Sequence, residues 1–499
     1  MRISRFVALL LICANGLPAQ TPPSDPSVVG KWSPVQKWPF VAIHAALLPN
    51  GKIVGWARKD GVAMLDTYAG DPKTGQFTKI LNQYEQPFCA GQTFLPDGRL
   101  LVAGGHDKWD NWGAIETTIF DYRTNTWSRS RNMNAGRWYP TTSPLANGDV
   151  VVISGSMPPG KRPEGSNGIN GMPQVWSNGM WRDLKGPFDQ FLELYPRIVL
   201  GPDGRIFMAG PRSLSRWLDT SGDGAWEDGP KTISSRVRDY GSVVPYAPGK
   251  VLTVGGADPP LATAETIDLN EKDPQWKATG SMANRRRQMN ATILADGTVL
   301  ATGGSSGSGF NNTTTPVFDA ELWDPATGKW TTMAKASVIR VYHSISLLLP
   351  DATVLNAGGG LPPWGDPPPK VLPDAPPGTS YERGPFHDNA QIYSPPYLFK
   401  GARPTISSAP SKVKYGETFT VATPDAESIG SVTWIHPGAV THAFDESQRF
   451  VRLDFKLYDG KLSVTAPDRD TISPPGPYML FLLNRDGVPS VAKWVTITK

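Results

Sequence analysis

Short runs of alternating apolar and polar residues, separated by glycine turns, fill most of this 499-residue chain. One unit recurs seven times: an apolar run, a turn, a run rich in Val, Ile and Leu, and then small residues ending in Gly. Its copies read AALLPNGKIVGWA, QTFLPDGRLLVAGG, TTSPLANGDVVVISG, RIVLGPDGRIFMAG, SVVPYAPGKVLTVGG, NATILADGTVLATGG and SISLLLPDATVLNAGGG. Asn-Gly or Asp-Gly between two apolar runs favours a β-hairpin, because both turn positions need positive φ. Each copy therefore predicts a hairpin.

A second hairpin, whose last strand carries an aromatic residue, follows each of the first six copies. The aromatic residues are Phe77, Trp127, Trp181, Trp226, Trp276 and Trp330. Four strands repeated about every fifty residues form a propeller blade, and the units resemble kelch repeats. The seventh copy lacks its aromatic strand, and GKWSPV around Trp32 has that strand's character. We expect a ring of seven blades, closed by this N-terminal segment.

The pattern changes after the seventh copy. LPPWGDPPPKVLPDAPPG, at 361–378, is too rich in proline for a helix or a central strand and is predicted to be an extended loop. From about residue 400, short alternating strands predict an Ig-like β-sandwich. The expected fold is therefore all-β, with a seven-bladed kelch-like propeller over 28–395 and a sandwich over 400–499.

The first twenty residues, MRISRFVALLLICANGLPAQ, have the layout of a secretory signal peptide. Two arginines precede an apolar run that is too short to span a membrane, and small residues follow it. We expect cleavage and secretion, with a retained anchor as the alternative. Cys13 would leave with the signal, so the mature protein would hold one cysteine, Cys89, and no internal disulfide.

Charge and hydropathy exclude two kinds of partner. The formal net charge is +4 and we find no basic stripe, so nucleic acid is not expected. No segment after the signal is apolar enough to cross a bilayer, and we expect a monomer.

Two histidines lie in distinctive surroundings: His343 in RVYHSISLLLPD and His442 in VTHAFDESQRF. These segments resemble the copper-ligand segments of the copper radical oxidases, the family of galactose oxidase and glyoxal oxidase. The resemblance implies that Tyr342 is an axial phenol ligand and His343 an equatorial imidazole ligand. It also implies that His442 reaches the same copper ion from a loop of the C-terminal domain.

The family's remaining element is a tyrosine joined through its ring to a cysteine sulfur. Arg-Trp-Tyr ending at Tyr139 and Phe-Cys-Ala around Cys89 match the two motifs, at equivalent points of neighbouring repeats. Taken singly, each feature has an ordinary explanation: a packed cysteine, a solvated loop histidine, or a Tyr-His pair with one core and one surface residue. Together, in order and over nearly the whole mature chain, they make the resemblance specific, and the resemblance implies a Cys89–Tyr139 thioether radical cofactor with Tyr139 as a fourth copper ligand.

The resemblance implies oxidation of small aldehydes or primary alcohols by O2, with release of H2O2 and with Tyr342 as general base. Three departures count against galactose: Met157 replaces an indole, Ser305 replaces a glutamine, and no galactose-binding domain precedes the propeller. Small aldehydes, as for glyoxal oxidases, are therefore preferred to carbohydrates, which remain an alternative. Arg238, or else Arg236, is predicted to contact a substrate oxygen, although either can be a solvated charge at a blade edge.

Two loops, 158–173 and 361–378, are predicted to wall the pocket because of their positions. The rival functions are a kelch-type binding protein without chemistry and a propeller hydrolase of the sialidase kind. The chain lacks the repeated Ser-x-Asp turns and the arginine triad of sialidases. For His44, His106 and His387 the sequence offers no chemical role.

Overall fold

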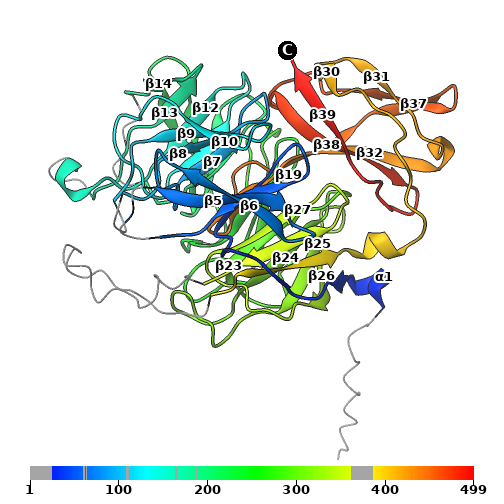
Figure 1. The fold of residues 1–499 in the computed structure, drawn as a ribbon, viewed down its shortest axis with the longest axis horizontal. Coiled ribbons are helices and arrows are strands. Elements are labelled where there is room, and N and C mark those ends of the chain that lie inside the picture. The colour runs from blue at the N-terminus through cyan, green and yellow to red at the C-terminus, as the bar shows by residue number, and fades with distance from the viewer. Residues whose placement is uncertain are drawn as a thin grey trace, which may run out of the picture.

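The structure, a computed structural model, describes residues 25–499 except 60, 61, 63, 108–111, 163–166, 187, 188, 190, 191 and 361–385. Strands dominate it, with one helix, α1 (Pro26–Val29), and short 3-10 turns at η1 (Pro159–Lys161), η2 (Pro396–Phe399) and η3 (Ala426–Ser428). Within these residues, seven sheets form a propeller and two more form a sandwich beside it, in orange and red in Figure 1. The predicted fold class is confirmed.

Five blades are antiparallel four-stranded sheets of consecutive strands, and the four consecutive strands of blade 1 are extended to a six-stranded sheet by β33 (Ala439–Thr441) and β34 (Phe444–Asp445). Blades 1 to 3 comprise β3 (His44–Leu47), β4 (Ile53–Trp56), β5 (Leu65–Asp71) and β6 (Gln76–Asn82); β7 (Gly91–Phe94), β8 (Leu100–Ala103), β9 (Thr117–Asp121) and β10 (Thr126–Arg129); and β11 (Thr141–Pro144), β12 (Val150–Ile153), β13 (Gln174–Ser177) and β14 (Met180–Asp183). Blades 4 to 6 comprise β15 (Arg197–Leu200), β16 (Ile206–Gly210), β17 (Leu214–Asp219) and β18 (Ala225–Lys231); β19 (Ser242–Ala247), β20 (Lys250–Val254), β21 (Ala264–Asp268) and β22 (Lys277–Thr279); and β23 (Arg287–Ile293), β24 (Val299–Ser305), β25 (Asp319–Asp324) and β26 (Lys329–Lys335).

The seventh blade is closed by the N-terminal segment. It contains β27 (Ser344–Leu348), β28 (Val354–Gly358) and β29 (Asn389–Ser394), and its outer edge is formed by β1 (Lys31–Trp32) and β2 (Gln36–Lys37). Trp32 pairs with Tyr393 across β1 and β29, and its indole donates to the Ala334 carbonyl of blade 6 at 2.8 Å. The predicted closure is confirmed, and it covers an edge that would otherwise expose unpaired backbone groups.

The turns and the aromatic residues behave as their chemistry requires. Gly98, in the second hairpin turn, has φ of 83°, and Ala352, in the seventh copy, has φ of 65°. Indoles link neighbouring blades through hydrogen bonds: Trp127 donates to Thr67 at 3.0 Å, and Trp276 donates to Ser215 at 2.9 Å. A buried indole needs such an acceptor, so these two residues hold blade 2 against blade 1 and blade 5 against blade 4.

The C-terminal sandwich consists of two sheets around its own apolar core. One sheet contains β30 (Lys412–Lys414), β39 (Lys493–Thr498), β38 (Gly476–Asn484), β32 (Ile429–His436) and β35 (Arg449–Leu453); the other contains β31 (Thr418–Val421), β37 (Lys461–Thr465) and β36 (Phe455–Tyr458). Between β32 and β35 the chain forms a hairpin, β33 (Ala439–Thr441) and β34 (Phe444–Asp445), in which β33 pairs with β3 of blade 1. We call residues 439–446 the axial hairpin.

Some predictions lie outside the described residues: the signal peptide at 1–20, the Pro-rich loop at 361–378 and part of the loop at 158–173. None of the helices in the described part of the chain is long and apolar enough to cross a membrane.

Candidate metal centre

One residue with a left-handed backbone stands at the start of the inner hairpin in each of blades 2 to 7. These residues are Cys89 (φ 65°), Tyr139 (63°), Tyr195 (45°), Tyr240 (52°), Gln288 (58°) and His343 (67°). Backbone hydrogen bonds join some successive members: Tyr139 N–H donates to the Cys89 carbonyl at 2.9 Å and Tyr195 N–H to the Tyr139 carbonyl at 2.7 Å. Non-glycine residues rarely adopt this conformation, and those that do gather at functional sites. The repeat thus brings reactive side chains of different blades together.

His343 and His442 face each other through their Nε2 atoms, 3.0 Å apart. Nδ1 of His343 lies 3.1 Å from the Gly360 carbonyl, which can only accept, so this Nδ1 carries the hydrogen. Nδ1 of His442 lies 2.6 Å from Oγ1 of Thr441, whose hydroxyl donates to the Ile43 carbonyl, so it carries a hydrogen as well. Burial lowers the pKa of both imidazoles well below its usual value, so they are neutral. The lone pairs of the two Nε2 atoms therefore point toward each other, and this arrangement suits metal ligation.

Two buried phenols lie beside these imidazoles. The hydroxyls of Tyr139 and Tyr342 are hydrogen-bonded to each other. The Tyr342 ring stacks on His343 with centroids 3.6 Å apart, and the Tyr139 ring lies 4.6 Å from that of His442. Burial raises the pKa of Tyr139 well above its usual value, so its phenolate needs a positive charge nearby. The four predicted ligands are thus brought together.

Cys89 is buried against the same cluster. Its Sγ lies 3.8 Å from Nε2 of His442, and its carbonyl accepts the hydrogen bond from the Tyr139 N–H. His44 holds its backbone, because the Cys89 N–H donates to Nε2 of His44 at 2.9 Å. No role for His44 was predicted, because no local motif signals a hydrogen bond between residues of adjacent blades.

An indole covers Tyr139, although it comes from a different position than the one expected in galactose oxidase. Trp138 stacks on Tyr139 with centroids 3.6 Å apart and an interplanar angle of 7°. Met157, where the sequence lacks an indole, is buried, and its N–H donates to the Gly168 carbonyl. Ser305, which replaces the glutamine, turns its hydroxyl toward Thr315 in its own loop.

Three further aromatic side chains, which no sequence motif indicated, lie at the cluster. Tyr195 lies 4.4 Å from Tyr139 between ring centroids, and Tyr240 lies 5.6 Å from Tyr342. Both occupy the same repeat position as Cys89, so aligning the seven copies could have found them. Phe310 lies 4.3 Å from the Tyr342 ring and is 44% exposed, which places an apolar surface at the edge of the cluster.

Arg238 is not brought to the cluster. It pairs with buried Glu265 at 2.7 Å and also donates to the Gly255 and Thr263 carbonyls. The same contact to a carbonyl of the inner hairpin recurs in other blades: Arg137 donates to Ser154, Arg286 to Gly303 and Arg340 to Gly358. Arg238 therefore holds blade 5 together, and the substrate contact predicted for it stays a prediction. No described contact joins partly exposed Arg236 to the cluster.

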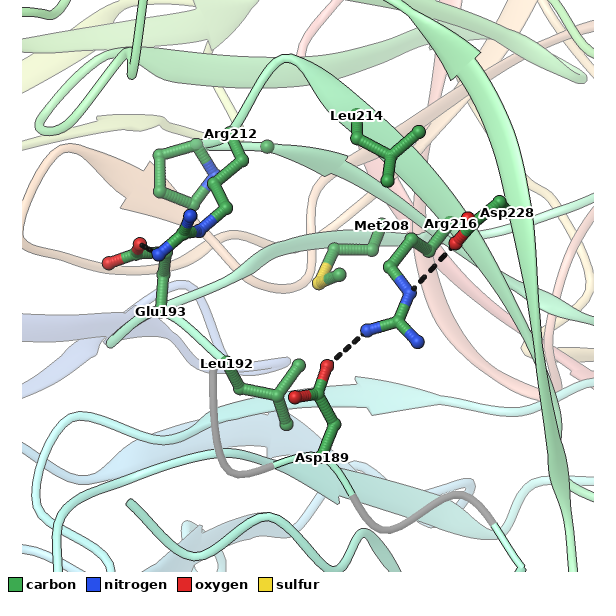
Figure 2. A pocket seen from close by; sticks show the side chains of 10 residues that line it. Asp189, Leu192, Glu193, Met208, Arg212, Leu214, Arg216 and Asp228 are labelled. Atoms are coloured by element: carbon green, nitrogen blue, oxygen red, sulfur yellow. Dashed lines mark hydrogen bonds and ion pairs between the residues drawn. The ribbon is translucent and has the colours of Figure 1, made fainter. Parts of the chain in front are cut away.

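A separate pocket of about 160 Å³ lies between blades 3 and 4 (Figure 2). Leu192, Met208 and Leu214 line it, and Arg216 crosses it to Asp189 and Asp228. None of the predicted site residues lines this pocket.

The donor set of the central cluster decides which metal fits. Among residues that the structure describes, no three His, Cys, Asp or Glu side chains converge on a common point. Oxygen donors at the cluster are therefore phenols. Two neutral imidazoles and two phenols fit Cu(II), which favours nitrogen and oxygen ligands.

Two family models match the chain. Residues 253–362 match the glyoxal oxidase N-terminus, and residues 403–497 match the galactose oxidase-like Early set domain.

Whole-chain comparisons agree with these matches. Galactose oxidase from Gibberella zeae is 29% identical, over 100% of this chain and 77% of its own length. Aldehyde oxidase GLOX from Vitis pseudoreticulata is 27% identical, over 90% of each chain. The solved structure of a fungal alcohol oxidase of the AA5 family in complex with copper has a TM-score of 0.81 and 26% identity, covering 94% of this chain and 100% of that one. By these matches the chain is similar to the copper radical oxidases, the group of galactose oxidase and glyoxal oxidase.

Proposed function

We propose that the protein is a copper radical oxidase that oxidises small aldehydes or primary alcohols with O2. The observation that carries the proposal is the pair of Nε2 lone pairs of His343 and His442, 3.0 Å apart and flanked by two phenols. Without a cation nearby, these lone pairs repel each other in a site that excludes water. The names of the relatives, galactose oxidase and aldehyde oxidase, support the same reaction class.

The proposal gives each side chain one role. His343, His442, Tyr139 and Tyr342 would hold the copper ion. Bound copper supplies one of the two oxidising equivalents that the reaction needs. Tyr139, linked through its ring to Cys89, would hold the other as a radical, since an ortho thioether lowers the oxidation potential of a phenol.

Tyr342 would accept the hydroxyl proton of an alcohol or of an aldehyde hydrate. Its hydrogen bond to Tyr139 and its contact with half-exposed Phe310 place it between the buried cluster and the outside. The balance is RCH2OH + O2 → RCHO + H2O2 for an alcohol, and RCH(OH)2 + O2 → RCOOH + H2O2 for an aldehyde hydrate.

Substrate preference favours small aldehydes over galactose. Ser305 is engaged in its own loop, and Met157 supplies no ring for a sugar to pack on. A relative named alcohol oxidase keeps primary alcohols in the proposal. We also propose that residues 1–20 are a cleaved secretion signal and that the mature protein is a monomer.

The test is peroxide release by copper-loaded protein with glyoxal, methylglyoxal, benzyl alcohol, glycerol and galactose. We expect the highest rates with the dialdehyde and the ketoaldehyde. His442→Asn serves as the control and should be inactive. A silent panel would instead favour a binding protein without chemistry, as would unlinked Cys89 and Tyr139 peptides after exposure to copper and air.

A further inference from the structure

Glu446, the last residue of the axial hairpin, is a buried carboxyl group outside the donor set described above. Its Oε2 accepts three hydrogen bonds: from Gln92 N–H at 3.1 Å, from Thr142 N–H at 2.7 Å and from the Thr142 hydroxyl at 2.7 Å. Oε1 has no hydrogen-bond partner among the described residues. One oxygen atom thus makes every hydrogen bond described for this side chain.

The hydrogen-bond donors to Glu446 lie on the two strands that follow Cys89 and Tyr139. Gln92 lies on β7, three residues after Cys89, and Thr142 lies on β11, three residues after Tyr139. These strands are the innermost of blades 2 and 3, so their inward N–H groups have no neighbouring strand in their own sheets. Such groups need an acceptor when they are buried. Glu446 supplies it to both strands at once, from four residues beyond His442.

Asp445, the neighbouring acidic residue, has a different structural role. Oδ1 of Asp445 accepts from the N–H groups of Ala439, Ser447 and Gln448 at 2.9–3.0 Å. All three belong to the axial hairpin or follow it directly. Asp445 therefore shapes the hairpin, whereas Glu446 attaches it to the strands that carry Cys89 and Tyr139.

We infer that Glu446 is a positioning residue for cofactor assembly: it fixes the Cys89 strand against the Tyr139 strand and so sets the rate of thioether formation. This inference rests on the proposed function. In that step the thiol S–H and one ring C–H are lost, the C–S bond forms, and O2 takes up two electrons and two protons to give H2O2. A bond between two side chains on separate blades depends steeply on their relative placement.

Rescue by a conservative variant distinguishes a positioning role of Glu446 from a general contribution to stability. Burial raises the pKa of Glu446 to about 8, so a neutral amide is a fair substitute for the side chain at neutral pH. The amide oxygen of Glu446→Gln can accept the same three donors, and Glu446→Ala offers none. Asp445→Ala is the matched control, because it removes an adjacent buried carboxylate that shapes the hairpin alone.

The experiment starts from copper-free, unlinked protein. Saturating Cu(II) is added without oxygen, then air is admitted, and samples are quenched over time and digested with trypsin. Mass spectrometry follows the linked peptide pair, which is lighter than the two separate peptides by two hydrogen atoms. The melting temperature and the copper dissociation constant are measured for each variant.

We expect Glu446→Ala to slow linkage by about tenfold or more at saturating copper, and Glu446→Gln to restore the rate to within about threefold. Asp445→Ala should weaken copper binding or lower the melting temperature, and yet link at close to the wild-type rate once copper saturates. Linkage of Glu446→Ala at the wild-type rate would overturn the inference, as would rates that follow the melting temperature across all variants.

Two further outcomes are informative. If Glu446→Ala does not fold, Thr142→Val removes one donor only, and we expect it to slow linkage by about twofold or more; an unchanged rate would contradict the inference. If the wild-type protein itself forms no link, the proposed function fails, which is distinguishable from failure of the role of Glu446 alone.

Discussion

The Nε2 atoms of His343 and His442 lie 3.0 Å apart, and both carry lone pairs because each Nδ1 hydrogen is already donated. For His442 the acceptor is Oγ1 of Thr441 at 2.6 Å. Partners of this kind fix the ring and its tautomer, and their loss costs about 10–100-fold in metal affinity. We therefore expect Thr441→Val to weaken copper binding by that factor, measured by competition with a chromophoric chelator.

A matched control exists for this threonine. Thr433 is also buried, and its hydroxyl donates to the Ala295 carbonyl at 2.8 Å, where the sandwich meets the propeller. Thr433→Val should change stability without changing copper affinity. Equal affinity losses in the two variants would mean that Thr441 acts only through general stability.

Arg238 provides a test of fold against substrate binding. Its ion pair with Glu265 is almost completely buried, and removing one partner of such a pair costs about 3–5 kcal/mol. We expect Arg238→Met to lower the free energy of unfolding by about that amount in urea titrations, with KM unchanged. Arg286→Met, which breaks the equivalent pair with Glu321 in blade 6, should behave alike. A clear rise in KM with unaltered stability would instead support the predicted substrate contact of Arg238.

The repeated fold was accessible from sequence because its signals are local. Turn residues set each hairpin, and even Ala352 takes the left-handed conformation that the seventh turn requires. The closure through Trp32 was predictable because the seventh repeat lacks its last strand and the N-terminal segment resembles that strand. The positions of Cys89, Tyr139, Tyr342, His343 and His442 were found through motifs, and the structure brings their side chains together.

What the sequence missed depends on partners distant along the chain. The sequence shows that Arg238 is charged, but it does not show that Glu265, 27 residues away, neutralises this charge. His44 acts through a bond to the backbone of Cys89, which leaves no motif. Tyr195 and Tyr240 were not predicted, because the motifs lie only in the blades that resemble the family's segments. Both tyrosines nevertheless occupy the same repeat position as Tyr139.

Trp138 should stabilise the proposed Tyr139 radical, because its indole stacks on the Tyr139 ring with centroids 3.6 Å apart. Aromatic pairs of this kind contribute about 0.5–1.5 kcal/mol beyond their buried area. We expect Trp138→Leu to speed the decay of the radical absorbance by roughly two- to tenfold in copper-loaded, oxidised protein. Trp276→Leu removes a buried indole that bonds Ser215 instead, and its radical should decay at the wild-type rate. Identical decay in both variants would remove Trp138 from this role.

His436 predicts how stability depends on pH. It lies on β32 of the sandwich, its Nδ1 is 3.0 Å from the Ser447 carbonyl, and burial lowers its pKa to about 3 from 6.5. Between these values the unfolded chain binds a proton that the folded chain does not. This contribution to stability is therefore complete above about pH 6.5 and is lost as pH falls toward 3, by up to about 1.4 kcal/mol per pH unit. Urea unfolding of copper-free protein at pH 7.5, 6 and 5 should show a steeper loss for the wild type than for His436→Gln. Parallel losses would show that His436 does not contribute to the acid sensitivity.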